Sequence, residues 1–188
     1  MTIRSFATSA CVLALCLMGA ASPGISGEAA RNPTAPFAVA AVQGAAPNFT
    51  GISNWFNSAP LDIAELRGKV VLVDFWTYGC VNCVNTLPHV TALYAKYKDR
   101  GLVVVGVHTP EFPFERSASN VQAALKRHGI TYPVAQDNES QTWNAYRNQY
   151  WPAQYIIDQS GKIVFQHDGE GRYEEIDRTI ARPLNASG

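Results

Sequence analysis

The feature that most constrains the fold is an apolar run that leads directly into a pair of cysteines. Lys69 to Trp76 reads KVVLVDFW, and the short segment TYG separates this run from Cys80 and Cys83. A run of β-branched and aromatic residues of this length is typical of a strand buried on both faces of a sheet. We therefore expect Cys80 to follow the end of a central strand.

The residues after the cysteines predict a helix and a second buried strand. Between Val81 and Lys98, apolar residues recur at steps of three and four, as on the buried face of a helix, and Pro88 is expected to kink it. Leu102 to Val107 reads LVVVGV, which is again continuously apolar. Strand, helix and strand in this order predict a parallel βαβ unit with a right-handed crossover.

The later segments predict an inserted αβ piece and a closing β-β-α unit. A helix is expected over Asn120–Arg127, and Gln154–Asp158 and Ile163–His167 flank QSGK as in a β-hairpin. Tyr173–Ala181 is expected to close the fold as a helix, and LDIAELRGK to form a short helical turn before the first strand. This order predicts an α/β fold whose central mixed β-sheet is flanked by helices and carries an αβ insertion.

The chain ends and the charge balance limit location and partners. The 188 residues carry 15 basic and 15 acidic side chains, whereas nucleic-acid binding needs a basic excess. Arg4 is the only charge before Glu28, and the roughly dozen apolar residues between them suit a signal peptide better than a membrane helix. We predict a signal peptide or N-terminal anchor over 1–28, a flexible linker over 29–48 and one domain over 49–188. The protein is then extracytoplasmic, most simply periplasmic.

Removal of the signal would leave only Cys80 and Cys83, because Cys11 and Cys16 lie within it. A zinc site needs four ligands, and the histidines form no paired motif that could complete one. A structural disulfide across two residues constrains little of the unfolded chain. At a helix start, free N–H groups and a partial positive charge favour the thiolate of Cys80, and Cys83 one turn later can attack a mixed disulfide. Redox chemistry without a metal or bound cofactor is therefore favoured.

Several separated motifs resemble one known family. VVLVDFWTYGCVNC, followed by LP, resembles the active-site signature of the thioredoxin-fold superfamily, and WPAQYIIDQSGKIV resembles its exported TlpA-like branch. WTYGCVNC and GVHTPEF are especially similar to the extracytoplasmic thioredoxin-like domain of DipZ-type proteins. The resemblance covers roughly residues 49–180 and implies a thiol–disulfide oxidoreductase that acts on protein thiols and disulfides. It also implies a membrane thiol carrier as electron donor if the protein is a reductant, and we expect a monomer.

The resemblance implies a role for each of four residues. Cys80 matches the attacking cysteine and Cys83 the resolving one, and the two form a redox-active disulfide. Asp74 matches a buried acid that moves protons to and from the inner cysteine, and burial is expected to raise its pKa toward neutrality. Pro152 matches a cis-proline that faces the cysteines, beside which an extended substrate chain can pair.

Three aromatic residues are candidate substrate contacts. Trp76 and Tyr78 precede the cysteine pair, and Trp151 precedes the predicted cis-proline, where many relatives carry a smaller residue. This tryptophan is expected to narrow the substrate groove. Asn82 stands where common relatives have proline, and its retained N–H group is expected to stabilise the Cys80 thiolate further.

Two other functions stay open at this point. Thr77 lies three residues before Cys80, as in the TxxC motif of peroxiredoxins, but Val73 stands where that family has a proline. The chain could also be a binding module that uses its cysteines only as a redox switch. His108 and Glu111 follow the second predicted strand, at the sheet edge where Cys80 is also expected. They either tune the thiol or contact a partner, or they are ordinary polar residues of a loop.

Overall fold

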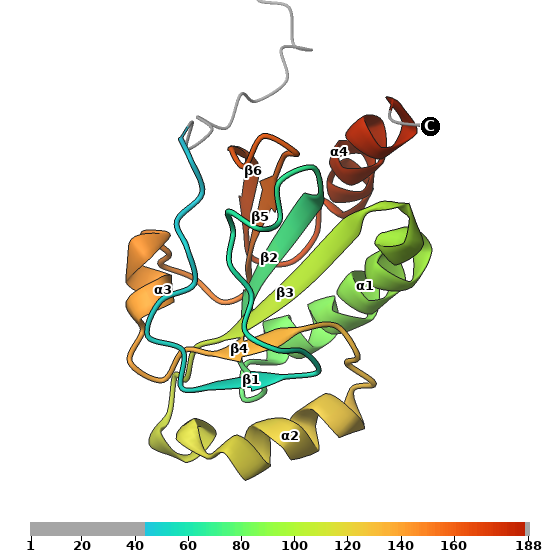
Figure 1. Ribbon diagram of the computed structural model, residues 1–188. Coiled ribbons are helices and arrows are strands. Elements are labelled where there is room, and N and C mark those ends of the chain that lie inside the picture. The colour runs from blue at the N-terminus through green and yellow to red at the C-terminus, as the bar shows by residue number, and fades with distance from the viewer. Residues whose placement is uncertain (1–43, 187–188) are drawn as a thin grey trace, which may run out of the picture. The chain divides into compact units, whose positions relative to one another are not determined.

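A six-stranded mixed sheet organises the residues that the computed structural model describes, 44–186 (Figure 1). Its spatial order is β1-β4-β3-β2-β5-β6. Strands β2, β3 and β4 are parallel to one another, and β1, β5 and β6 run antiparallel to their neighbours. The strands are β1 (Asn54–Phe56), β2 (Val70–Trp76), β3 (Leu102–His108), β4 (Val134–Gln136), β5 (Ala153–Ile157) and β6 (Ile163–Asp168). The predicted mixed sheet with flanking helices is confirmed.

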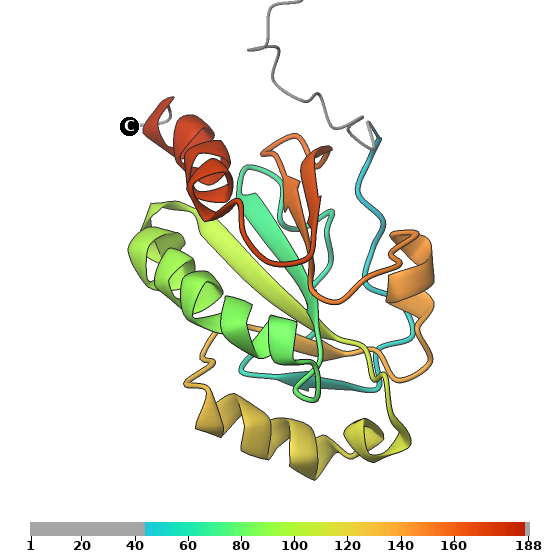
Figure 2. The same cartoon turned by 180° about the vertical axis from the view of Figure 1, so that it is seen from behind.

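Helices cover both faces of this sheet. Helices α1 and α4 cross the face seen in Figure 2, whereas α3 and the segment before β2 lie on the other face. The helices are α1 (Val81–Tyr97), α2 (Ala118–Arg127), α3 (Gln141–Ala145) and α4 (Tyr173–Ala186), with 3-10 turns η1 (Lys98–Arg100) and η2 (Pro113–Arg116). None of the helices between residues 44 and 186 is long and apolar enough to cross a membrane.

The alternation of side chains along β2 builds two hydrophobic cores. All seven residues of β2 are buried. Val70, Leu72 and Trp76 belong to the core under α1 and α4, whereas Val73 and Phe75 belong to the core on the opposite face. A strand buried on both faces has no polar side, which explains its continuous apolar sequence. The last residue of β2 lies just before the cysteine pair.

The structure shifts several predicted boundaries. Helix α1 ends at Tyr97 and continues as η1, which stops where Gly101 adopts the left-handed φ of 103°. The segment LDIAELRGK forms turns without a helix, and strand β1 was not predicted. Residues 44–48, the end of the predicted linker, already contact the domain, since Ala45 bridges Lys162. The predicted signal peptide and most of the predicted linker lie outside the described residues.

Candidate active site

Cys80 occupies the N-terminal cap of α1. Its backbone is extended, with φ −87° and ψ 115°, and its sulfur accepts a hydrogen bond from the Cys83 N–H at 3.3 Å. The predicted donor was Asn82, but a cap side chain can reach the third N–H of the helix, and this is the one that it meets here. Cys80 is partly exposed, so an incoming sulfur can reach it.

Cys83 lies one turn into α1 and is fully buried, and both cysteines are free thiols. Burial raises the pKa of the Cys83 thiol, and its hydrogen bond with Cys80 raises the pKa further. The structure therefore separates an accessible sulfur from an inaccessible one. Cys83 can therefore react only with the sulfur of Cys80, once Cys80 is part of a disulfide.

Asp74 is a buried carboxyl group on β2, on the face that packs against α1. Its Oδ1 accepts a hydrogen bond from Gln154 Nε2 at 3.1 Å, across the β2–β5 pair. Burial raises the pKa of Asp74 from 3.8 to about 7, and the glutamine offsets only part of this effect. The direction is the one that the sequence predicts. The Asp74 charge also contributes to the raised pKa of Cys83, so the two groups interact.

The loop before β5 brings the backbone of Trp151 to the cysteine pair. The Trp151–Pro152 peptide bond is cis, and the Cys80 thiol donates to the Trp151 carbonyl oxygen at 3.8 Å. The Trp151 indole is held in place because its Nε1 donates to Thr109 O at 3.1 Å and its ring packs 4.1 Å from that of Trp143. Trp151 therefore forms a fixed, half-buried wall beside Cys80.

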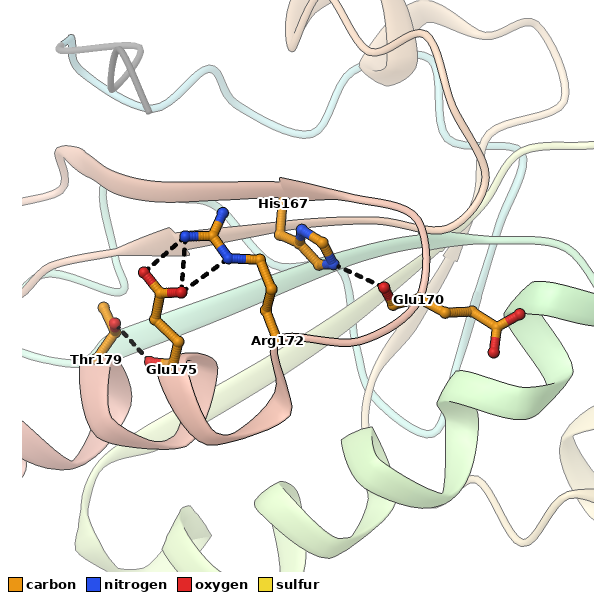
Figure 3. A network of polar contacts seen from close by, with 5 residues as sticks. All are labelled: His167, Glu170, Arg172, Glu175 and Thr179. Atoms are coloured by element: carbon orange, nitrogen blue, oxygen red, sulfur yellow. Dashed lines mark hydrogen bonds and ion pairs between the residues drawn. The ribbon is translucent and has the colours of Figure 1, made fainter. Parts of the chain in front are cut away.

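The connection between β6 and α4 carries a network of polar contacts (Figure 3). His167 Nε2 donates to the Glu170 carbonyl oxygen at 3.1 Å, and Arg172, whose φ is 52°, is held by Glu175 through Nε and Nη2 at 2.7 Å each. The amide of Gly169 donates to Pro152 O at 2.8 Å. These contacts fix the connection and support the Pro152 loop.

Tyr78 and His108 stack beside the cysteine pair, with ring centroids 5.4 Å apart. His108 is buried, and its Nε2 lies 3.3 Å from Thr77 Oγ1. Burial lowers the pKa of His108 to about 4, so the imidazole is neutral near pH 7. The exposed carboxylate of Glu111 makes no contact in this group. His108 is therefore a buried, uncharged ring against which the Tyr78 ring packs.

Trp76 corrects one sequence prediction. It was grouped with the substrate contacts, but its side chain is fully buried in the core under α1 and meets His108 edge to face at 5.2 Å. Its position on the inward face of β2 is the reason, since β2 is covered on both faces. Trp76 supports the site from beneath, and of the three predicted aromatic residues only Tyr78 and Trp151 lie at its surface.

Sequence reasoning missed a loop and a carboxylate next to Cys80. Phe112 and Phe114 are exposed and stack on each other at 5.6 Å. Tyr78 Oη donates to Phe114 O at 3.0 Å, and the fully buried Glu115 accepts from the Gly79 N–H at 2.9 Å. The only signal was a set of aromatic residues in a polar, proline-containing loop, which does not indicate where the loop packs.

Among residues 44–186, no group of three His, Cys, Asp or Glu side chains is arranged to hold a metal ion. The polar groups that converge at the site are instead two thiols, a buried carboxyl and backbone amides. This set can exchange disulfides and can move a proton between a carboxyl and a thiol.

Comparison with known proteins identifies the family. Residues 42–166 match the model of the AhpC/TSA family. The chain is 48% identical over 145 residues to Protein DipZ of Mycobacterium tuberculosis, covering 76% of this chain but only 21% of DipZ. It therefore spans about a fifth of the length of that relative. It is also 31% identical over 126 residues to the thiol-disulfide oxidoreductase YkuV of Bacillus subtilis, covering 66% of this chain and 84% of YkuV.

A solved structure with the same fold supports the same family. The thiol:disulfide interchange protein of Chlorobium tepidum superposes with a TM-score of 0.63 at 26% identity, covering 76% of this chain and 97% of that one. The predicted resemblance is thus confirmed at the level of family and fold. The chain belongs to the AhpC/TSA family and, within the thioredoxin fold, to the family of thiol–disulfide oxidoreductases.

Proposed function

We propose that the protein exchanges disulfides with protein thiols outside the cytoplasm, with Cys80 as nucleophile and Cys83 as resolving residue. The observation that carries this proposal is the contrast between the two sulfurs. Cys80 is accessible at the helix start and faces the Trp151 backbone, whereas Cys83 is fully buried one turn behind it. An extended substrate could therefore meet Cys80 first and Cys83 only later.

The reaction needs only the two sulfurs and a proton acceptor. The Cys80 thiolate attacks a substrate disulfide, an S–S bond forms between the two proteins, and the other substrate sulfur leaves as a thiolate that takes up a proton from water. Cys83 then gives its proton to the ionised form of Asp74 and attacks the Cys80 sulfur. This closes the Cys80–Cys83 disulfide and releases the second substrate sulfur as a thiolate, which takes up a proton. Two electrons have then passed to the substrate. Substrate oxidation is the reverse sequence.

Asp74 suits this role because its pKa, about 7, lies near a neutral working pH. No dissociable cofactor enters the cycle. A reducing protein would need electrons from a membrane thiol carrier, and we propose that it acts as a monomer. The extracytoplasmic location rests on the export segment predicted over 1–28, and finding the full chain in the cytoplasmic fraction of its host would contradict it.

Insulin reduction with dithiothreitol as electron source tests the exchange. Wild-type protein should turn over, Cys80→Ser should not, and Cys83→Ala should accumulate a mixed disulfide with its substrate. Absence of turnover together with absence of a trapped species would contradict the proposal and leave the redox-switched binding module.

A peroxidase is the second candidate, because the family match is to AhpC/TSA and Thr77 precedes Cys80 as in TxxC. Peroxide consumption by the same preparations separates the two activities. Consumption that survives in Cys83→Ala, without insulin turnover, would favour the peroxidase.

A further inference from the structure

A buried carboxylate joins the turn before Cys80 to the neighbouring aromatic loop. Glu115 is fully buried, yet its carboxyl group forms no ion pair with a basic side chain among the described residues. Its Oε1 accepts from the Gly79 N–H at 2.9 Å, and its Oε2 accepts from the N–H groups of Glu111 at 2.6 Å and Phe112 at 2.9 Å. An ionised carboxyl group can only accept hydrogen bonds, and all three partners of Glu115 are N–H donors.

The contacts of Glu115 place this anion at the nucleophile. Gly79 immediately precedes Cys80, and Tyr78 Oη donates to Phe114 O at 3.0 Å, which is a second link between the same turn and the same loop. The Glu115 charge also acts on His108 and Tyr78, the ring pair that stacks beside the cysteines. The proposed mechanism gives Glu115 no part, since it assigns the proton transfer to Asp74.

We propose that Glu115 is a positioning residue that holds the Tyr78–Gly79 turn and places a buried negative charge at the residue before Cys80, near enough to act on the Cys80 sulfur. This inference rests on the proposed function, because it concerns Cys80 as the nucleophile. The helix start favours the thiolate, and the Glu115 anion opposes it. The balance shifts the protein toward its disulfide state and makes the dithiol a better reductant. The three hydrogen bonds keep the loop that carries Phe112 and Phe114 against the turn while this charge is buried.

The test follows the reactivity of Cys80 with iodoacetamide against pH in the Cys83→Ala background. Two unit charges roughly 10 Å apart, at an effective dielectric constant of about 20, shift each other's titration by about one pH unit. Glu115→Gln should therefore move the midpoint of alkylation down by about one pH unit. In the chain with both cysteines, the same change should lower the equilibrium constant for oxidation by up to about tenfold.

Glu111→Gln is the matched control. It removes an exposed carboxylate from the same loop, and only the backbone of this residue takes part in the Glu115 network. Its midpoint should stay within about 0.2 pH units of the reference. An equal shift in both variants, or none in folded Glu115→Gln, would overturn the proposal.

Gly79→Ala gives an independent route to the same result if Glu115→Gln fails to fold. A Cβ at Gly79 would overlap Glu115 Oε1, whereas the backbone of Gly79 lies outside the left-handed region and accepts alanine. This variant displaces the carboxylate without removing it, and its alkylation midpoint should move in the same direction. Loss of the fold in both variants would reduce Glu115 to a purely structural residue and overturn the inference.

Alkylation of Cys80 needs no substrate protein. The role of Glu115 and the proposed exchange activity can therefore be refuted independently of each other. A wild-type chain that is inactive on insulin but still shows the Glu115-dependent shift would refute the activity alone. A chain that is active on insulin with no such shift would refute the role of Glu115 alone.

Discussion

At the scale of residues, burial separates the tasks of chemically similar groups. Cys80 and Cys83 are three positions apart, yet one sulfur is accessible and the other is sealed under α1. Asp74 and Glu115 are both buried carboxyl groups, but Asp74 has a single amide partner, whereas Glu115 accepts three backbone N–H groups. A carboxyl with few donors is costly to ionise and can therefore exchange protons near neutral pH.

Asp74→Asn should stabilise the protein in a pH-dependent way. The pKa of Asp74 is 3.8 ordinarily and about 7 in the fold, so between these values the folded chain binds a proton that the unfolded chain has released. The stabilisation that protonated Asp74 gives to the folded wild-type protein is therefore lost as the pH rises from about 4 to 7. The free energy of unfolding of Asp74→Asn should exceed that of wild type by about 2–4 kcal/mol at pH 8 and by little at pH 4.

Urea denaturation at pH 4, 6 and 8 measures this difference. Asp99→Asn, an exposed site in η1, is the control and should change stability by less than about 0.5 kcal/mol at every pH. A gap between Asp74→Asn and wild type that does not vary with pH would show that Asp74 is not the titrating group.

At the scale of elements, the site depends on close packing of side chains against the backbone of β3. Gly106 lies opposite Asp74 in the parallel β2–β3 pair. A Cβ there would lie 3.0 Å from Trp76 Nε1, 3.1 Å from Tyr132 Cε2 and 3.2 Å from Val134 Cγ2. Glycine usually weakens a strand, so its presence in β3 is explained by this close packing. The space that it leaves is filled by the two aromatic side chains that line the core beside Asp74.

Gly106→Ala is expected to destabilise the domain by about 1–3 kcal/mol, because the extra methyl group must displace packed aromatic rings. Thermal unfolding followed by circular dichroism measures the effect. Gly44→Ala is the control, since nothing lies within 4 Å of its added Cβ. If Gly106→Ala unfolds at the wild-type temperature, the packing around β3 is looser than the structure indicates.

At the scale of the whole molecule, the segment before β2 closes one face of the sheet. Phe49 and Ile63 belong to the core on the α3 side, and Trp55 packs against it. Thr50 and Thr142 exchange two hydrogen bonds of 2.8 Å, which tie this segment to α3. The domain therefore needs residues that precede its first long strand by about twenty positions.

Two shortened chains test this requirement. A chain that begins at residue 44 should unfold cooperatively, whereas one that begins at residue 58 should lose cooperative unfolding. The second lacks β1, Phe49 and Trp55, and each large buried apolar side chain contributes roughly 1.5–3 kcal/mol. Circular dichroism melts compare the two. Equal melting temperatures would show that the segment is dispensable.

The sequence alone determined the elements whose signal is local. Continuous apolar residues marked β2 and β3, the three- and four-residue steps marked α1, and the chain order placed Cys80 at a helix start. These patterns are readable because strand and helix periodicities repeat within a few residues. The short strand β1 was missed because three residues carry no period.

Only the tertiary structure decided which groups surround the sulfur of Cys80. Trp151 O reaches that sulfur from 71 positions away, Gln154 meets Asp74 across 80, and Glu115 meets Gly79 across 36. No local pattern records such pairs, because they depend on how distant segments pack once the sheet has formed. The same packing buries Trp76, which the sequence could place beside the cysteines but not beneath them.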